Sequence, residues 1–150
     1  MKPLLILLAV FTITMGITKL LTQQVNVIFS AQLGMCAMLC FTAAGHFIFT
    51  KGMTMMVPPI VPFKTALVYF TGVLEIVLGI GLLIPAVRMY AGYLLIILFI
   101  VLLPANIYAA IKQINYQKGT LDGYGLSYLW FRVPLQFLFI GWIYFSSIKK

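Results

Sequence analysis

Five long apolar runs, separated by short segments that hold most of the charged and turn-forming residues, dominate the hydrophobic pattern of this chain. An apolar helix of about 20 residues, rising about 1.5 Å per residue, crosses the roughly 30 Å hydrocarbon layer of a bilayer. No run alternates with the period of two that membrane barrels require, so the pattern predicts helices. The predicted spans are Leu4–Leu21, Val27–Thr50, Lys64–Ile84, Arg88–Ile111 and Tyr128–Ile148.

The connections between the spans differ in character. Pro85 ends the third span only three residues before the fourth begins, which predicts a tight helical hairpin. The segment Lys51–Pro62 contains three methionines and three prolines and hardly any polar side chain, so we expect it to lie in the membrane interface or to fold back over the helix ends. Lys112–Ser127 is polar, and Asp122–Gly123 predicts a turn within it.

The composition excludes a soluble or a disordered chain. Of 150 residues, 63% are hydrophobic and 8% are charged, against about 25% charged in soluble domains. The formal charge of +8 comes from cations that occur singly and form no basic face, so they indicate interfacial anchors and not nucleic-acid binding. We therefore predict an all-α, polytopic transmembrane helical bundle that forms a single membrane domain over residues 1–150.

The first span has two interpretations. Lys2 followed by an apolar run is also typical of a secretory signal, but no cleavage site of small residues follows at the right distance. A retained helix over residues 4–21 is favoured, and a cleaved signal stays open.

Five strongly polar side chains lie inside the other spans, where a charged group costs about 2.5 to 3.5 kcal/mol at the bilayer centre. Counting along each helix places three of them roughly 6 to 8 Å deep, Gln136 near 12 Å and Glu75 near 16 Å. All five depths fall in the same half of the bilayer, which predicts a funnel-shaped polar site with Glu75 at its floor. The candidate ligand-binding residues are His46, Glu75, Asn106, Arg132 and Gln136.

Helical spacing supports this site. Gly72, Glu75 and Gly79 share one face of the third span, where small residues allow a neighbouring helix to approach closely. Arg132 and Gln136 also share a face. Two prolines inside these spans free backbone carbonyls near the same region: Pro104 frees that of Ile100, and Pro134 frees that of Trp130.

Each candidate also has a structural interpretation. Glu75 can pair with Arg132 and lock the bundle. His46 can be a hydrogen-bonded interface residue, Asn106 can join helices, Arg132 can extend its charge to the interface, and Gln136 can support its neighbours.

No motif identifies a catalytic or metal centre. One His cannot supply two axial haem ligands, and the few His, Cys and carboxylate residues show no zinc spacing. Cys36 and Cys40 lie four residues apart on one helix, a spacing that does not suit a disulfide. We expect both to pack as small hydrophobic side chains. The chain has no phosphate-binding glycine loop, nucleophile elbow or dinucleotide fingerprint, so whether it is an enzyme stays open.

Motifs over about residues 34–144 together resemble the DoxX-like family of integral membrane proteins. These motifs are Gly45-His46-Phe47, Val57-Pro58-Pro59 with Pro62, Gly72 with Glu75, Gly81-Leu82-Leu83-Ile84-Pro85 with Arg88, Pro104-Ala105-Asn106, and Arg132-Val133-Pro134 with Gln136.

The resemblance implies a four-helix bundle over about residues 27–148, to which the first span is an addition. It also implies that Lys149 and Lys150 are cytoplasmic, that the polar site opens outward, and that the five polar residues form a family-like site. Members of that family include a subunit associated with a thiosulfate–quinone oxidoreductase, relatives linked to membrane redox complexes, and distant relatives linked to receptor assembly.

The leading hypothesis is therefore an accessory subunit of a redox complex in the bacterial inner membrane, with a polar pocket for a quinone or a lipid-like ligand. The first alternative is a non-catalytic chaperone or structural partner of another membrane protein, and a further one is a self-contained enzyme or transporter. The expected partners are membrane lipid, a quinone, and either a membrane protein or a second copy of the chain. Nucleic acid, haem and metal are not expected.

Overall fold

A computed structural model describes residues 2–149, and within them the chain is all-α. Five helices in this range are long and apolar enough to cross a membrane, which confirms the predicted fold class and the number of spans. The helices are α1 (Lys2–Thr22), α2 (Val27–Ile48), α3 (Thr50–Met56), α4 (Lys64–Gly81), α5 (Arg88–Ile111) and α6 (Leu126–Ile143), and α6 continues into a π-helical turn, η1 (Tyr144–Ile148).

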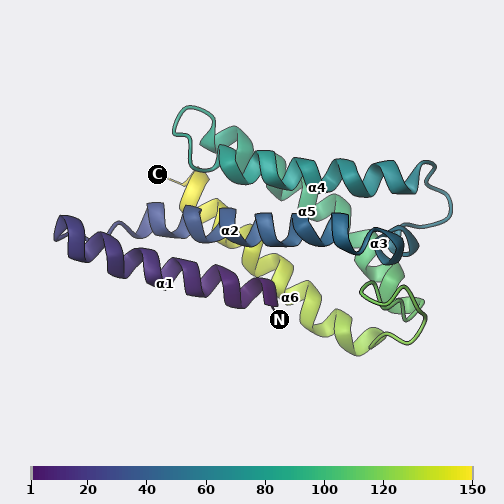
Figure 1. The fold of residues 1–150 in the computed structure, drawn as a ribbon. Coiled ribbons are helices and arrows are strands. Elements are labelled where there is room, and N and C mark those ends of the chain that lie inside the picture. Colours follow the sequence, from purple (N-terminus) through teal and green to yellow (C-terminus); the bar gives the residue numbers. More distant parts are fainter. Residues whose placement is uncertain (1, 150) are drawn as a thin grey trace.

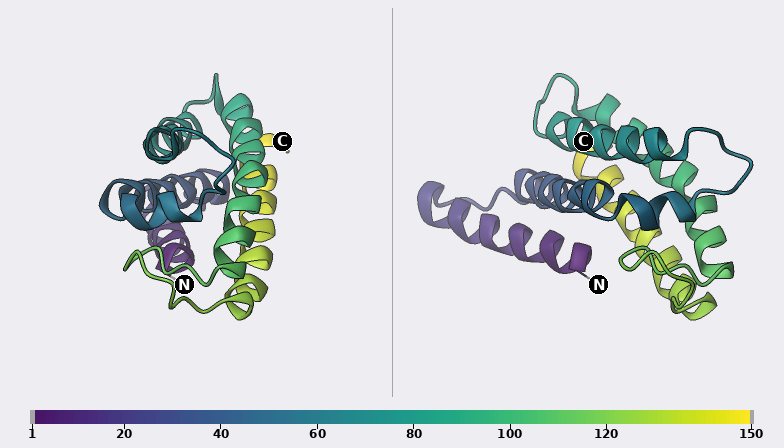
Figure 2. Two further views of the ribbon diagram at one scale, coloured as in Figure 1. Left: turned by 90° about the vertical axis from the view of Figure 1, so that its right-hand side faces the viewer. Right: turned by 45° about the vertical axis from the view of Figure 1, so that its right-hand side comes forward.

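The spans form two layers. Helices α1, α2 and α4 lie side by side with α2 in the middle, while α5 and α6 pass behind them (Figures 1 and 2). The most extensive contacts join α1 to α2, α2 to α4, and α5 to α6. Polar side chains on α2 and α4 can therefore meet directly, whereas those on α5 and α6 belong to the second layer.

The core lies where the two layers meet. Leu7 of α1 inserts into it, although most of α1 is exposed. The outward faces of the helices carry many exposed large apolar side chains, as expected for a bundle surrounded by lipid. The main core residues are Leu7, Met35, Met38, Leu39, Leu78, Leu82, Ala91, Leu95, Leu98, Phe99, Leu135, Phe139 and Ile143.

Helices α4 and α5 contact each other across a short turn, as the hairpin prediction required. The predicted end of the third span is wrong by three residues, because α4 ends at Gly81 and not at Ile84. The N–H of Leu83 donates to the carbonyl of Ile80, and that of Ile84 to Gly81, so the chain tightens into i→i+3 turns before Pro85.

The second predicted span is interrupted at Phe49, where α2 ends and the short helix α3 begins. Helix α3 contains the methionines of the Lys51–Pro62 segment and contacts α2, α4 and α5, so this part folds back over the helix ends. The chain after α3 extends outward, with Ile60 89% and Phe63 84% exposed.

The polar loop between α5 and α6 turns earlier than predicted. An antiparallel bridge joins Asn115 to Thr120, and Gly119 adopts a φ of +66°, a conformation that glycine tolerates without strain. The N–H of Gly123 donates to the carbonyl of Gln113, which packs the predicted turn against the end of α5. Helix α6 then begins at Leu126, two residues before the predicted span.

Candidate functional site

A buried His–Glu pair joins α2 to α4. The Nε2 atom of His46 lies 3.5 Å from Oε1 of Glu75. The hydroxyl of Thr42 donates to the other carboxyl oxygen, Oε2, at 2.7 Å. Glu75 is only 4% exposed, and both of its oxygens have partners, as a buried carboxyl requires.

The second ring nitrogen of His46 faces two oxygen atoms of α4. Nδ1 lies 3.0 Å from the carbonyl oxygen of Val68 and 3.2 Å from the hydroxyl oxygen of Thr71. Because a carbonyl can only accept, we assign a proton to Nδ1. The other ring nitrogen, Nε2, is the one that faces the carboxyl group of Glu75.

Glycine makes this contact between α2 and α4 close. A Cβ atom at Gly72 would lie 2.8 Å from the Cβ of His46, and one at Gly79 would lie 3.4 Å from the Cβ of Leu39. The predicted packing face of Gly72, Glu75 and Gly79 is therefore confirmed.

The predicted difference in depth between His46 and Glu75 is too large, because their side chains are in contact. Glu75 still lies deeper than His46, since Gly72 is the residue of α4 beside His46, and Glu75 also bonds to Thr42, one turn further into α2. Counting from helix ends assumed that neighbouring helices start at one level. The first turns of α4 instead lie beside α3, beyond the end of α2 (Figure 1). Glu75, well inside α4, therefore meets His46, which is close to the end of α2.

Thr42 and Thr71 were missed by the sequence analysis. Thr42 lies four residues before His46, and Thr71 four residues before Glu75, so each shares a helix face with its neighbour. This spacing was the available signal for both residues.

Arg132 does not pair with Glu75, so the interpretation in which these two residues lock the bundle is wrong. Its Nη1 atom donates to the hydroxyl of Tyr128 at 2.9 Å. The physical reason is that α6 packs against α5, in the layer opposite α4.

Asn106 and Gln136 are both buried in the second layer. The Nε2 atom of Gln136 donates to the backbone carbonyl of Phe99, one residue before the carbonyl that Pro104 was expected to free. Gln136 thus joins α6 to α5. Of the five predicted site residues, the structure brings only His46 and Glu75 into direct contact, and a funnel that unites all five stays a prediction.

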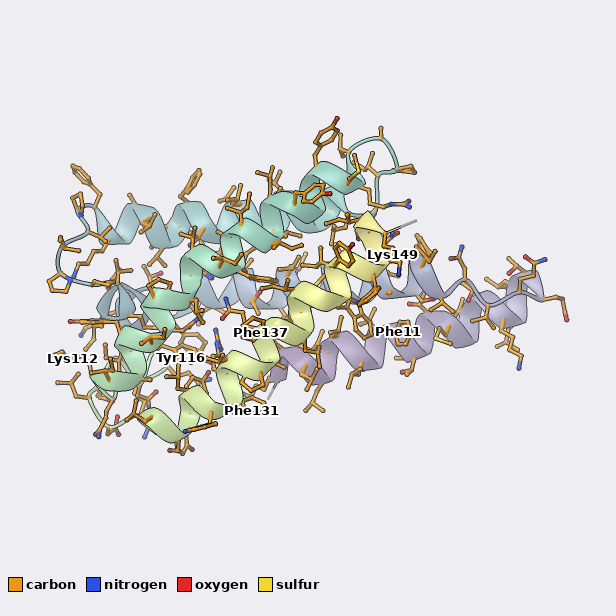
Figure 3. The ribbon with its side chains drawn as sticks, turned by 180° about the vertical axis from the view of Figure 1, so that it is seen from behind. Phe11, Lys112, Tyr116, Phe131, Phe137 and Lys149 are labelled. Atoms are coloured by element: carbon orange, nitrogen blue, oxygen red, sulfur yellow. The ribbon has the colours of Figure 1, made fainter. Side chains whose placement is uncertain are left out.

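Helix α3 and the loop between α5 and α6 together form a cap over the end of the bundle at which α2 ends. A Cβ atom at Gly52 of α3 would lie 1.8 Å from the backbone oxygen of Tyr116, so helix and loop touch through the glycine itself. The rings of Phe49 and Tyr116 pack edge to face at 6.0 Å. Tyr116 and Lys112 lie at this end of the molecule, and Lys149 at the other (Figure 3).

Tyr116 makes the stability of this cap sensitive to alkaline pH. Burial raises the pKa of Tyr116, Tyr128 acts in the same direction, and the charge of Arg132 opposes both. Since the folded state disfavours the phenolate, the stabilisation is complete below the unfolded pKa of about 10 and is lost as pH rises through the higher folded pKa.

We therefore expect Tyr116→Phe to lose less stability than the wild type between about pH 9 and 12. The measurement is the free energy of unfolding in mixed micelles across this range. Tyr124→Phe is the matched control, because Tyr124 is 85% exposed. Parallel stability curves for Tyr116→Phe and the wild type would contradict the prediction.

The cysteines are unpaired, as their spacing predicted: Cys36 is buried and Cys40 is exposed. Within residues 2–149, no three His, Cys, Asp or Glu side chains are placed so that they could hold a metal ion.

Fold and site together define a small polytopic membrane protein with a buried polar contact between two of its spans. A family model described as a domain of unknown function, DUF8561, matches residues 35–147, and the chain belongs to that family. The match begins inside α2 and leaves α1 outside. No curated protein and no solved structure matches the chain.

Proposed function

We propose that this protein is a DoxX-like accessory subunit of a membrane redox complex and that the His46–Glu75 pair serves a quinone or a similar lipid-soluble ligand. The observation that carries the proposal is the pair itself, which is buried between two spans and places an imidazole against a carboxyl group. A quinone carbonyl needs a hydrogen-bond donor. The imidazole of His46 can supply that donor, and Glu75 lies directly beside it.

The surroundings of the pair support the proposal. The side chain of His46 is 12% exposed and that of Glu75 is 5% exposed, so the ligand approaches from the imidazole side. Arg132 of α6 and the buried Asn106 of α5 are the proposed further donors. In this proposal the chain holds the ligand in the bacterial inner membrane, and a partner subunit carries the electrons.

A quinone titration tests this function. The protein in lipid nanodiscs is titrated with decylubiquinone, and binding is followed by quenching of the fluorescence of Trp130 and Trp142. We expect saturable quenching and an affinity about tenfold weaker in Glu75→Gln, because one charge-assisted hydrogen bond is lost.

The control is Gln32→Met, because Gln32 is a buried polar residue of α2 whose amide bonds to the carbonyl of Ser146, away from the pair. Equal affinity of the wild type and Glu75→Gln would refute the proposal. If Gln32→Met loses as much quinone affinity as Glu75→Gln, the loss reflects general destabilisation of the protein. That result would also count against the proposed function.

The alternative is a non-catalytic chaperone or structural partner of another membrane protein. The observation that favours it is that both carboxyl oxygens of Glu75 and both ring nitrogens of His46 already have partners within the protein, as in a contact that only locks two helices. Mass spectrometry of the protein extracted from its native membrane separates the two functions. A stoichiometric protein partner retained in Glu75→Gln, without bound quinone, would favour the alternative.

A further inference from the structure

Arg88 is a half-buried cation that no acidic side chain balances. The chain has only two acidic side chains, and both are engaged elsewhere. Glu75 contacts His46 between α2 and α4. Asp122 pairs with Lys118 in the loop before α6. Of the guanidinium nitrogens of Arg88, Nε is buried without a hydrogen-bond partner among the residues that the structure describes, whereas the outer pair, Nη1 and Nη2, is not buried in this way.

The position of Arg88 in α5 does not explain this cation. Arg88 is the first residue of the helix, and no side chain caps that end. The helix dipole places partial positive charge at a helix N-terminus, where a second positive charge is unfavourable. The charge of Arg88 therefore needs an anion that its own helix does not supply.

A second cation lies beside the start of α5. A Cβ atom at Gly92, one helical turn after Arg88, would lie 3.1 Å from Cγ1 of Ile148, so the end of η1 packs against the first turns of α5. Lys149 follows directly and is exposed. Figure 3 shows Lys149 where η1 ends, next to the turn between α4 and α5. Its Nζ atom lies 5.4 Å from the centre of the Phe145 ring.

We propose that Arg88 and Lys149 bind the phosphate group of an anionic phospholipid, with Nη1 and Nη2 of Arg88 donating to two phosphate oxygens. Arginine matches phosphate through paired hydrogen bonds, and lysine binds it as a point charge. Arg88 begins α5 and Lys149 follows η1, so both lie at the ends of spans, which is the level of the lipid headgroups. The site goes beyond the proposed function, because it lies at the end of the bundle opposite the cap.

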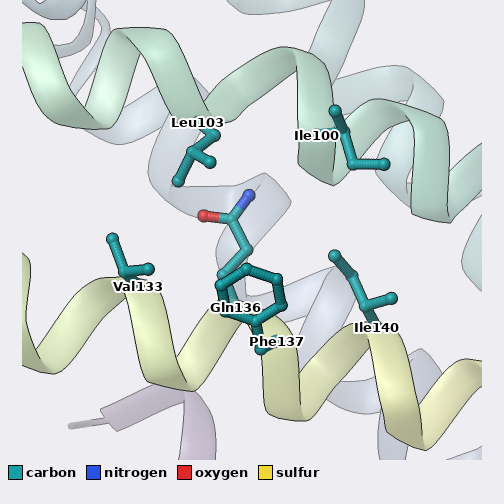
Figure 4. Close-up of a pocket in the computed structure, with 6 residues that line it drawn as sticks. All are labelled: Ile100, Leu103, Val133, Gln136, Phe137 and Ile140. Atoms are coloured by element: carbon teal, nitrogen blue, oxygen red, sulfur yellow. The ribbon is translucent and has the colours of Figure 1, made fainter.

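Helices α5 and α6 also offer a surface for an acyl chain. A shallow groove of about 40 Å³ lies between them and presents only apolar surface (Figure 4). Ile100 on its wall follows Arg88 by 12 residues, about 18 Å along the helix, and one leaflet of the hydrocarbon layer is about 15 Å deep. An acyl chain that starts at the Arg88 phosphate therefore reaches the groove near its end. This contact favours a lipid over a soluble phosphate.

Two lipids that differ in headgroup charge test the site. The delipidated protein in detergent is titrated with dioleoylphosphatidylglycerol, which is anionic, or with dioleoylphosphatidylcholine, whose choline balances the phosphate. Bound lipid is counted by native mass spectrometry. We expect the wild type to bind the anionic lipid about tenfold more tightly, as a charge-assisted hydrogen-bonded contact predicts. Arg88→Gln should remove this preference, and Arg88→Lys, which keeps the charge but lacks the paired donors, should lower it about threefold.

The matched control is Lys19→Gln, because Lys19 is an exposed cation in the last turn of α1 and its replacement lowers the net charge equally. This variant should keep the preference. Lys149→Gln covers the case in which the Arg88 variants fail to fold, since Lys149 is exposed after the last helix, and it should lower the preference about threefold. Glu75→Gln should also keep the preference, so a failure of quinone binding and a failure of lipid binding are distinguishable.

Three results would overturn the proposal. The first is equal binding of the two lipids to the wild type, and the second is a preference that Lys149→Gln leaves unchanged. The third is a loss in Lys19→Gln as large as in Arg88→Gln, which would indicate a diffuse effect of net charge. Glycerol 1-phosphate carries the same phosphate without acyl chains, and we expect it not to displace the bound lipid. Displacement would assign the site to a soluble phosphate and would refute the lipid.

Discussion

Replacing His46 with Leu is expected to lower the free energy of unfolding by about 3 kcal/mol, because removing one partner from a buried pair leaves the other uncompensated. In this variant Glu75 keeps only the hydroxyl of Thr42, while its Oε1 faces the new apolar side chain. The measurement is the free energy of unfolding in mixed micelles.

Adding Glu75→Leu to His46→Leu should restore most of the loss, to within about 1 kcal/mol of the wild type, because an apolar contact can replace a buried ion pair. The remaining polar groups keep partners, since Thr42 turns to the carbonyl of Leu39 and Thr71 to that of Leu67. The double-mutant cycle is thus strongly non-additive. Losses that simply add would show that the contact between His46 and Glu75 contributes nothing, and would remove the basis of the proposed function.

Gly52→Ala is expected to destabilise the protein by about 3 kcal/mol, at the upper end of what overpacking costs. The new Cβ would lie 1.8 Å from the oxygen and 2.5 Å from the carbon of the Tyr116 carbonyl, which are backbone atoms and cannot rotate away. Helix α3 must therefore separate from the loop, and the contact between Phe49 and Tyr116 is weakened.

Gly141→Ala is the matched control for this substitution. No atom lies within 4 Å of the position of its Cβ, and alanine favours helix over glycine by about 1 kcal/mol, so this variant should be as stable as the wild type or slightly more so. The measurements are the free energy of unfolding and hydrogen exchange of the loop amides between residues 115 and 120. Unchanged loop exchange in Gly52→Ala would contradict the predicted separation.

The candidate site was only partly predictable from the sequence. The spacing of Gly72, Glu75 and Gly79 identified the face of α4 that packs against a neighbouring helix, because helical periodicity is a local property. The same periodicity could not identify the neighbour. Glu75 meets His46 of α2 and not Arg132 of α6, and that choice depends on which helices share a layer.

The break at Phe49 shows a further limit. Hydrophobicity continues through Thr50, so the pattern favoured one unbroken span, whereas the chain bends and packs α3 over the bundle end. This bend is stabilised by a contact between Gly52 and Tyr116, which lie 64 positions apart in the chain.

The sequence by itself determined the all-α class, the five helices that are long and apolar enough to cross a membrane, and the inward face of α4, because the cost of burying polar groups in lipid acts on each segment separately. Only the tertiary structure decided that His46 contacts Glu75, that Arg132 bonds to Tyr128, and that Gln136 holds α5 while its oxygen lacks a donor. These contacts depend on the relative height and layer of whole helices, which packing between distant segments determines.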